Sequence, residues 1–159
     1  MKPYRVLFVC MGNICRSPAG EAVLRKLAED AGLDDHIEID SAGTIGFHSG
    51  SQPDHRMHAA ASNRGIRTGG QARQVQPGDL DTFDRVLAMD SENLRDLQAL
   101  AQTQAQLDSI RPFCEYCQEH DIRDVPDPYY GGAQGFEIVL DLLEDGCQQL
   151  LDEARDALE

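Results

Sequence analysis

Residues 4–18 read Tyr4-Arg-Val-Leu-Phe-Val-Cys10-Met-Gly-Asn-Ile-Cys-Arg16-Ser-Pro18. The segment up to Cys10 is a continuous apolar run of strand length, which is typical of a parallel strand buried on both faces. Gly12 and Asn13 interrupt this run, and beyond Pro18 the apolar residues recur at helical spacing until Gly32. The pattern therefore predicts a buried strand, a tight loop and an amphipathic helix.

The rest of the chain continues this alternation of strands and helices. Further strands are expected at residues 37–40, with a break at Ser41-Ala42-Gly43, and at residues 85–89 and 109–113; helices are expected at residues 54–63, 90–100 and 135–158. This order predicts an α/β fold whose short parallel sheet is covered on both sides. No repeat or linker interrupts the chain, so we expect one domain spanning residues 1–159. In such sheets ligands bind beyond the carboxyl ends of the strands, which favours the loop after the first strand.

The composition narrows the classes of partner. The chain has 159 residues and a net charge of −14, from 28 acidic and 14 basic residues. An acidic surface repels nucleic acid and anionic membranes, so neither is expected as a partner. No apolar run reaches the ~20 residues of a membrane span, and no secretory signal is evident at the start, so we expect a cytoplasmic protein. The five cysteines are expected to be reactive or buried thiols rather than a disulfide framework.

The loop from Cys10 to Ser17 has the residues of an anion site. Backbone N–H groups that face inward at the start of a helix form an anion-binding nest, and Arg16 adds a guanidinium that chelates two oxygens. The same donors stabilise a thiolate at Cys10, which would lie behind the phosphorus of a bound phosphoryl group. Ser17 is expected to donate a hydrogen bond to this thiolate, and Asn13 to hold an unusual backbone turn. The alternative interpretation is a core cysteine beside a helix-capping segment.

Asp127 is the candidate general acid. A thiolate that displaces a phosphoryl group from a phenol leaves a phenolate, which needs a proton. Asp127 stands between Pro126 and Pro128, which restrict the backbone, and is followed by Tyr129 and Tyr130. A turn with an Asx-type hydrogen bond is the alternative interpretation of this segment.

These motifs resemble the low-molecular-weight protein-tyrosine phosphatases. The resemblance is carried by residues 6–18, Asp40-Ser-Ala-Gly-Thr44, Ala72-Arg-Gln74, Met89-Asp90 with Asn93-Leu94, and Asp127-Pro-Tyr-Tyr-Gly131. It implies a three-layer sandwich with a four-stranded parallel sheet, and hydrolysis of phosphotyrosine in proteins through a phosphocysteine intermediate, without a cofactor or a metal. Cys10 would be the nucleophile, Arg16 the phosphate binder and Asp127 the acid that then activates water.

The resemblance implies further site residues. The phosphate-binding loop would comprise Met11, Gly12, Asn13, Ile14, Cys15 and Ser17, and the substrate pocket would be walled by Ile14, Phe47, Tyr129 and Tyr130. Cys15 matches a position that forms a reversible disulfide with the nucleophile, which implies redox regulation. Phosphotyrosine proteins would be the substrates, and inorganic phosphate a product inhibitor. Gly70 departs from the pattern, because eukaryotic members have a histidine there that helps to hold the loop asparagine.

Three other functions fit parts of this pattern. An arsenate reductase needs a relay of further cysteines, but no cysteine lies between Ile66 and Arg111. A protein-arginine phosphatase typically has threonine at the position of Ile14, whose branched apolar side chain suits a phenyl ring better than a guanidinium. An idle phosphate-binding or thiol-sensing module would not turn over, and the nucleophile, arginine and acid are all present here. The pattern favours phosphotyrosine.

A second cysteine motif reads Cys114-Glu-Tyr-Cys117-Gln-Glu-His120. Three ligand types this close resemble half of a zinc site, although no second pair follows at zinc-finger spacing. A redox pair and inert loop thiols are the alternatives, and all three interpretations stay open at this point.

Overall fold

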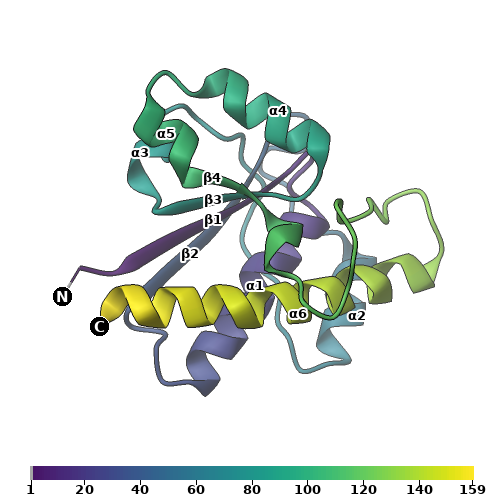
Figure 1. Ribbon diagram of the computed structural model, residues 1–159. Coiled ribbons are helices and arrows are strands. Elements are labelled where there is room, and N and C mark those ends of the chain that lie inside the picture. The colour runs from purple at the N-terminus through teal and green to yellow at the C-terminus, as the bar shows by residue number, and fades with distance from the viewer. Residues whose placement is uncertain (1) are drawn as a thin grey trace.

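A four-stranded parallel sheet in the order β2-β1-β3-β4 runs through the protein (Figure 1). The computed structural model describes residues 2–159. Its strands are β1 (Tyr4–Cys10), β2 (Ile37–Gly43), β3 (Arg85–Ala88) and β4 (Ile110–Pro112). Its helices are α1 (Arg16–Asp30), α2 (His55–Ser62), α3 (Asp79–Thr82), α4 (Ser91–Leu100), α5 (Gln104–Ser109) and α6 (Ala133–Leu158), with the 3-10 helix η1 (Phe113–Tyr116). The predicted α/β fold with its parallel sheet is confirmed.

The central strand β1 contributes side chains to two apolar cores. Val6 and Phe8 belong to the core that β1 shares with α1 and α6, whereas Leu7 and Val9 belong to the core under α3 and α4. All four side chains are fully buried. Figure 1 shows the same division, with α1, α2 and α6 on one side of the sheet and α3, α4 and α5 on the other. Because successive side chains of a strand point to opposite faces, a strand covered on both sides is apolar throughout.

The strand β2 is longer than its composition predicts. The sequence predicted a break at Ser41-Ala42-Gly43, but β2 pairs with β1 without interruption until Cys10 lies opposite Gly43. Pairing with the central strand overrides the turn-forming tendency of these residues. Gly43 is required there, because a Cβ atom would lie 2.7 Å from the carbonyl oxygen of Met11. The helices α3 and α5 were also missed, since segments this short carry no helical periodicity.

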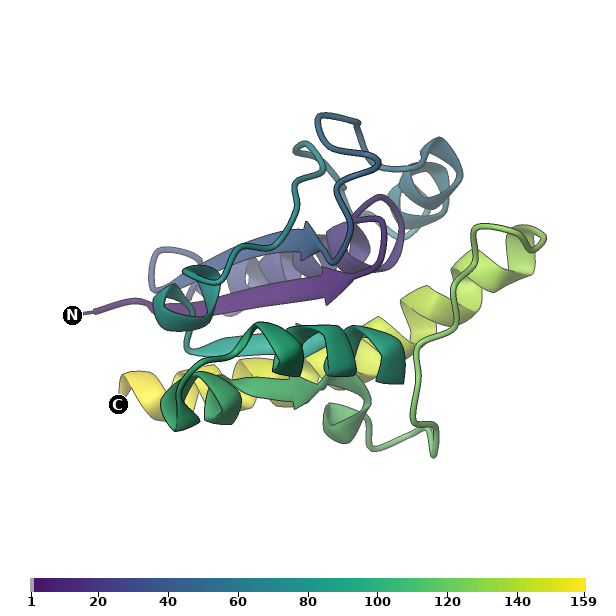
Figure 2. The ribbon, with the colours of Figure 1, turned by 90° about the horizontal axis from the view of Figure 1, so that it is seen from above.

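The carboxyl ends of the strands meet at one edge of the sheet. Because β1 lies between β2 and β3, the chain leaves β1 at a switch in strand order, where α/β sheets bind ligands. Seen from above (Figure 2), the strands point toward the side that holds the loop after β1 and the start of α6, and α6 ends on the opposite side. Among residues 2–159, no helix is long and apolar enough to cross a membrane.

The contact between η1 and α6 tolerates no added volume. A Cβ atom on Gly146 would lie 2.6 Å from Cε2 of Phe113 and still closer to Cζ, and the Phe113 ring is fully buried. We expect Gly146→Ala to lower the free energy of unfolding by about 1 to 3 kcal/mol, because an overpacked core must shift to relieve the clash.

Gly135→Ala on the same helix is the matched control. Its Cβ atom would lie 3.5 Å from Pro128, which is an ordinary contact, so the free energy of unfolding should stay the same or rise by up to ~1 kcal/mol, because alanine favours a helix more than glycine does. Urea denaturation of both variants checks the difference. Equal stability of the two would show that Phe113 has room to move.

Candidate active site

The loop from β1 to α1 turns its carbonyl groups outward. The carbonyls of Cys10, Met11 and Ile14 accept hydrogen bonds of 2.9, 3.2 and 2.7 Å from the backbone N–H groups of Thr44, Ile45 and Asp54. In a planar trans peptide the N–H of the next residue points to the opposite side. The N–H groups of residues 11, 12 and 15 therefore point away from these donors, toward the cavity that the loop surrounds. The helix α1 then begins at Arg16 without a side-chain cap, which leaves its first N–H groups free for an anion.

The cavity inside this loop is narrow, with a volume of about 50 Å³. Loop residues 10–12 and 14–16 line it together with His48, Asp127, Tyr129 and Tyr130. The structure thus brings together most of the predicted site residues, although their segments are far apart in the sequence. Asn13 and Ser17 are buried in the loop but are not among the lining residues, and Phe47 lies outside the cavity.

Cys10 lies at the base of the loop and is 2% exposed. Its Sγ atom lies 3.0 Å from the Ser17 hydroxyl and accepts a hydrogen bond of 3.2 Å from the N–H of Asn13. Asn13 has a φ of 59°, which confirms the predicted unusual turn. These two polar neighbours are the kind that stabilise a negative sulfur.

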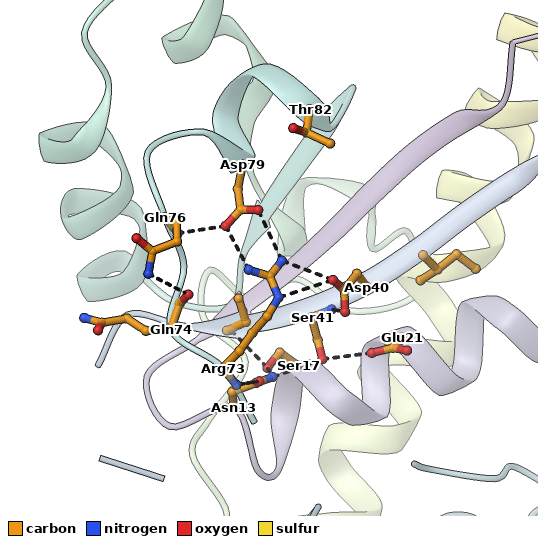
Figure 3. Close-up of polar contacts among 12 residues, drawn as sticks. Asn13, Ser17, Glu21, Asp40, Ser41, Arg73, Gln74, Gln76, Asp79 and Thr82 are labelled. Carbon is orange, nitrogen blue, oxygen red and sulfur yellow. Dashed lines mark hydrogen bonds and ion pairs between the residues drawn. The ribbon is translucent and has the colours of Figure 1, made fainter. Parts of the chain in front are cut away.

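The side chain of Asn13 ties the loop to the sheet (Figure 3). Its amide group donates to the Ser17 hydroxyl at 2.8 Å and to the Ser41 hydroxyl at 3.0 Å, and its Oδ1 atom accepts from the N–H of Arg73 at 2.9 Å. Ser41 in turn donates to Glu21 at 2.9 Å. Three hydrogen bonds thus hold Asn13 without the histidine that the resemblance places at Gly70.

Arg73 is held in place by two carboxylates. Its guanidinium donates to Asp40 in β2 and to Asp79 in α3 over 3.0 to 3.3 Å, as Figure 3 shows. Asp79 also accepts from the N–H of Gln76 at 2.7 Å. Because the backbone N–H of Arg73 binds Asn13, the ion pairs of Arg73 with Asp40 and Asp79 also help to hold the loop in position. In the sequence, Arg73 stands out only as part of the segment Ala72-Arg-Gln74.

Arg16 is buried, with 3% of its surface exposed. One Nη atom donates to Asp90 at 2.6 Å and to the carbonyl of Val125 at 3.1 Å, and the other lies 3.6 Å from Asp127. Burial by itself lowers the pKa of Arg16, but Cys10 and the hydrogen-bonded Asp90 raise it above its ordinary value. Arg16 therefore keeps its charge in a buried position.

Asp90 makes two kinds of contact. One of its carboxylate oxygens accepts from the N–H of Asn93 at 2.8 Å and caps α4. The other oxygen orients Arg16. The available signal was its place directly after β3, because the carboxyl end of β3 lies beside that of β1 in a parallel sheet.

Asp127 forms the predicted Asx-type turn and also lies at the cavity. Its Oδ1 atom accepts from the N–H of Tyr129 at 3.0 Å, which is the Asx-type turn. Its Oδ2 atom faces Arg16, and the side chain, 34% exposed, lines the cavity. The turn therefore presents the carboxyl group to the cavity.

Aromatic rings form the outer wall of the cavity. Tyr129 and Tyr130 meet edge to face with ring centroids 5.0 Å apart, and the guanidinium of Arg56 in α2 lies 5.3 Å from the centroid of the Tyr129 ring. Phe47 is 83% exposed and packs edgewise on His48, which lines the cavity in its place. His48 was missed because the loop that holds it carries no local pattern.

Cys15 is the second buried thiol of the loop. Burial and the neighbouring Asp54 carboxylate raise the pKa of Cys15 to about 12, so its thiol is neutral at physiological pH.

In the part of the chain that the structure describes, no group of three or more His, Cys, Asp or Glu side chains is arranged to hold a metal ion. His120 instead binds Asp145 at 2.7 Å, so the geometry does not support the half-zinc-site interpretation.

Residues 5–158 match the family described as low molecular weight phosphotyrosine protein phosphatase. The chain belongs to this family. A member from Bacillus subtilis, YfkJ, is 46% identical over 147 residues, which cover 92% of this chain and 92% of that protein. The crystal structure of a protein tyrosine phosphatase from Entamoeba histolytica, with Hepes in its active site, has a TM-score of 0.94 at 38% identity and covers 98% of this chain and 99% of its own.

One solved structure that resembles this phosphatase family member is named for a different substrate class, arginine. The crystal structure of a Drosophila arginine phosphatase has a TM-score of 0.86 at 31% identity and covers 96% of this chain and 97% of its own. The shared fold therefore does not by itself separate tyrosine from arginine phosphatases.

The two loop cysteines should differ in reactivity toward iodoacetate. We expect carboxymethylation of Cys10 at pH 7, because the N–H groups and Arg16 attract the carboxylate of the reagent, while the neutral, buried Cys15 stays free. Neutral iodoacetamide is the control and should react roughly tenfold more slowly. Tandem mass spectrometry of the tryptic peptide 6–16 locates the label. If Cys15 were labelled before Cys10, or if both reagents labelled Cys10 at the same rate, this expectation would be contradicted.

Proposed function

We propose that this protein hydrolyses phosphotyrosine in proteins through a phosphocysteine intermediate on Cys10. The observation that carries the proposal is the cavity itself, which has a buried cysteine at its base, inward N–H groups and a buried arginine around it, and Asp127 at its side. Membership of the phosphatase family supports the reaction class.

In the first step the thiolate of Cys10 attacks the phosphorus of the bound phosphotyrosine. The S–P bond forms as the bond between phosphorus and the phenolic oxygen breaks, and Asp127 gives its proton to the leaving oxygen. The N–H groups of the loop and the guanidinium of Arg16 bind the non-bridging oxygens, whose charge is spread in the transition state. The Ser17 hydroxyl stabilises the sulfur before attack.

In the second step water regenerates the enzyme. Asp127, now a carboxylate, takes a proton from water, whose oxygen attacks the phosphorus, and the S–P bond breaks. The sulfur leaves as a thiolate, which the Asn13 N–H and the Ser17 hydroxyl stabilise. Inorganic phosphate is the product and is expected to inhibit by occupying the same loop.

The walls of the cavity favour an aromatic substrate. Ile14, Tyr129 and Tyr130 line it and offer apolar surface to a phenyl ring. A guanidinium would need a polar partner that Ile14 does not provide. We therefore propose phosphotyrosine rather than phosphoarginine as the reacting group.

The charge, the fold and the state of the cysteines support proposals about the partners, the domain organisation and the cellular compartment. The net charge of −14 supports phosphoprotein substrates with basic flanks and disfavours nucleic acid and anionic membranes. One sheet with both faces covered supports a single domain for the whole chain. All five cysteines are free, which suits a reducing compartment such as the cytoplasm.

Phosphate release from matched phosphotyrosine, phosphoarginine and phosphoserine peptides tests the function. We expect turnover of phosphotyrosine only and its abolition in Cys10→Ser. Asp127→Asn keeps an acceptor for the Tyr129 N–H but has no acidic proton, so kcat should fall by about 10²- to 10⁴-fold.

The leaving group provides the control. kcat/KM reports formation of the phosphocysteine, so Asp127→Asn should lower it less for p-nitrophenyl phosphate, whose phenolate leaves without a proton. Turnover of phosphoarginine alone would assign the protein to the arginine phosphatases, and the absence of any turnover would overturn the proposal.

We also propose that Cys10 and Cys15 form a reversible disulfide. Both thiols belong to the same loop and line the same narrow cavity. Peroxide would oxidise the Cys10 thiolate to a sulfenic acid, and the Cys15 thiol would then displace water and form the S–S bond.

This disulfide predicts a difference in recovery after oxidation. The native protein should lose activity in mild peroxide and regain most of it with dithiothreitol. Cys15→Ser should lose activity and stay inactive, because its sulfenic acid oxidises further. Recovery is measured relative to each protein's own untreated activity. Full recovery of Cys15→Ser would contradict the disulfide.

A further inference from the structure

Cys114 and Cys117 form a second pair of thiols at η1. Cys114 lies within this 3-10 helix, and Cys117 ends it by donating its N–H to the carbonyl of Cys114 at 3.2 Å. In a 3-10 helix the side chains of residues three apart are eclipsed, and a rise of about 2.0 Å per residue separates their Cα atoms by roughly 6 Å along the axis. A disulfide spans a Cα separation of about 4.4 to 6.8 Å. The backbone therefore already has the spacing of a disulfide.

The two thiols also influence each other's titration. Cys117 lowers the pKa of Cys114, while Cys114 together with burial raises the pKa of Cys117. The pair thus has the asymmetry of a dithiol in which one sulfur reacts first and the other resolves. The sulfur of Cys117 also lies 3.5 Å from the carbonyl of Leu142.

Small reagents have access to this pair. Cys114 lines a cavity of about 350 Å³ between η1, α4 and the segment around Arg123, and Cys117 is only partly buried. Cys147 provides the contrast within the same chain. It is fully buried, and burial raises the pKa of its thiol. A reagent in solution therefore reaches Cys114 and Cys117 but not Cys147.

The pair stands at the start of the segment that leads to Asp127, but separate contacts fix the later part of that segment. Asp124 accepts from the N–H and the hydroxyl of Ser91 at 3.0 and 2.9 Å. Val125 donates its N–H to the carbonyl of Met89 at 2.8 Å and accepts from Arg16 at 3.1 Å. These contacts lie between the thiols and Asp127, so a local change at η1 should not reach the carboxyl group.

We propose that Cys114 and Cys117 are a second, reversible disulfide site, separate from the loop that holds Cys10. With peroxide as the oxidant, the thiolate of Cys114 attacks one oxygen, the O–O bond breaks, and a sulfenic acid and hydroxide form; the hydroxide takes up the proton that the Cys114 thiol had released and becomes water. The sulfur of Cys117 then attacks that of Cys114, the S–S bond forms, and the departing hydroxide takes the Cys117 proton as a second water. The two thiols lose two electrons and two protons, and the peroxide is reduced to two molecules of water.

The test uses the full chain with Cys10→Ser and Cys15→Ser, which removes the first pair. The protein is equilibrated in glutathione buffers of increasing disulfide content or treated with peroxide, then quenched in acid, alkylated and digested with trypsin. The tryptic peptide 96–123 contains Cys114 and Cys117 as its only cysteines, because trypsin does not cleave between Arg111 and Pro112. Peptide 124–155 contains only Cys147.

We expect peptide 96–123 to lose the mass of two hydrogens and both alkylation sites, and to regain them with dithiothreitol. Cys147 should stay a free thiol throughout, and Cys117→Ser should abolish the disulfide. Two free thiols in peptide 96–123 at every glutathione ratio, or only mixed disulfides with glutathione, would overturn the proposal. This readout requires no phosphatase activity, so it is independent of the proposed function.

A second measurement tests the separation from the active site. In the chain with Cys10 and Cys15 intact, inorganic phosphate protects the loop during oxidation and is then removed. Phosphotyrosine turnover should remain within about twofold of the untreated protein, as it should in Cys117→Ser treated in the same way. If activity fell in proportion to the disulfide formed in peptide 96–123, and did not fall in Cys117→Ser, the proposal that this site is separate from the active site would be overturned.

Discussion

The turn at Asn13 is the constraint on which the rest of the site depends. A left-handed residue in the middle of the loop from β1 to α1 reverses the chain within a few residues. Carbonyl groups of the loop then accept hydrogen bonds from the segments after β2 and before α2, and N–H groups face the cavity. An L-amino acid holds such a conformation only where its surroundings compensate for the strain. Here the three hydrogen bonds of the Asn13 side chain, to Ser17, Ser41 and the Arg73 backbone, supply that compensation.

The phosphate site that we propose lies within the same loop, although the protein has a net charge of −14. The attraction is local, because it comes from backbone dipoles and one buried guanidinium rather than from the surface. Asp90 keeps Arg16 oriented, while the longer contact to Asp127 places an acid beside the same guanidinium. A buried charge of this kind is tolerated only when it is paired and hydrogen-bonded, and Arg16 is both.

Three environments for thiols coexist in the chain. The loop pair combines Cys10, set among hydrogen-bond donors, with the neutral Cys15; the η1 pair couples Cys114 to Cys117; and Cys147 is enclosed in the apolar core. The differences arise from neighbours and burial, since the side chain is the same in each case. Oxidation is therefore expected to be selective among the five cysteines.

The sequence by itself determined the local features. The apolar run of β1 predicted a strand buried on both faces, the turn residues and Arg16 predicted an anion-binding loop, and the prolines around Asp127 predicted a restricted turn. Tertiary structure alone decided the extension of β2 to Gly43, the partnership of Arg16 with Asp90, the support from Arg73 and the place of His48 in the wall. The physical reason is the distance along the chain over which each kind of interaction acts. Periodicity and turn chemistry act between neighbours along the chain, whereas the contacts of Asn13 with Arg73 and of Arg16 with Val125 join residues 60 and 109 positions apart, and only the folded sheet brings them together.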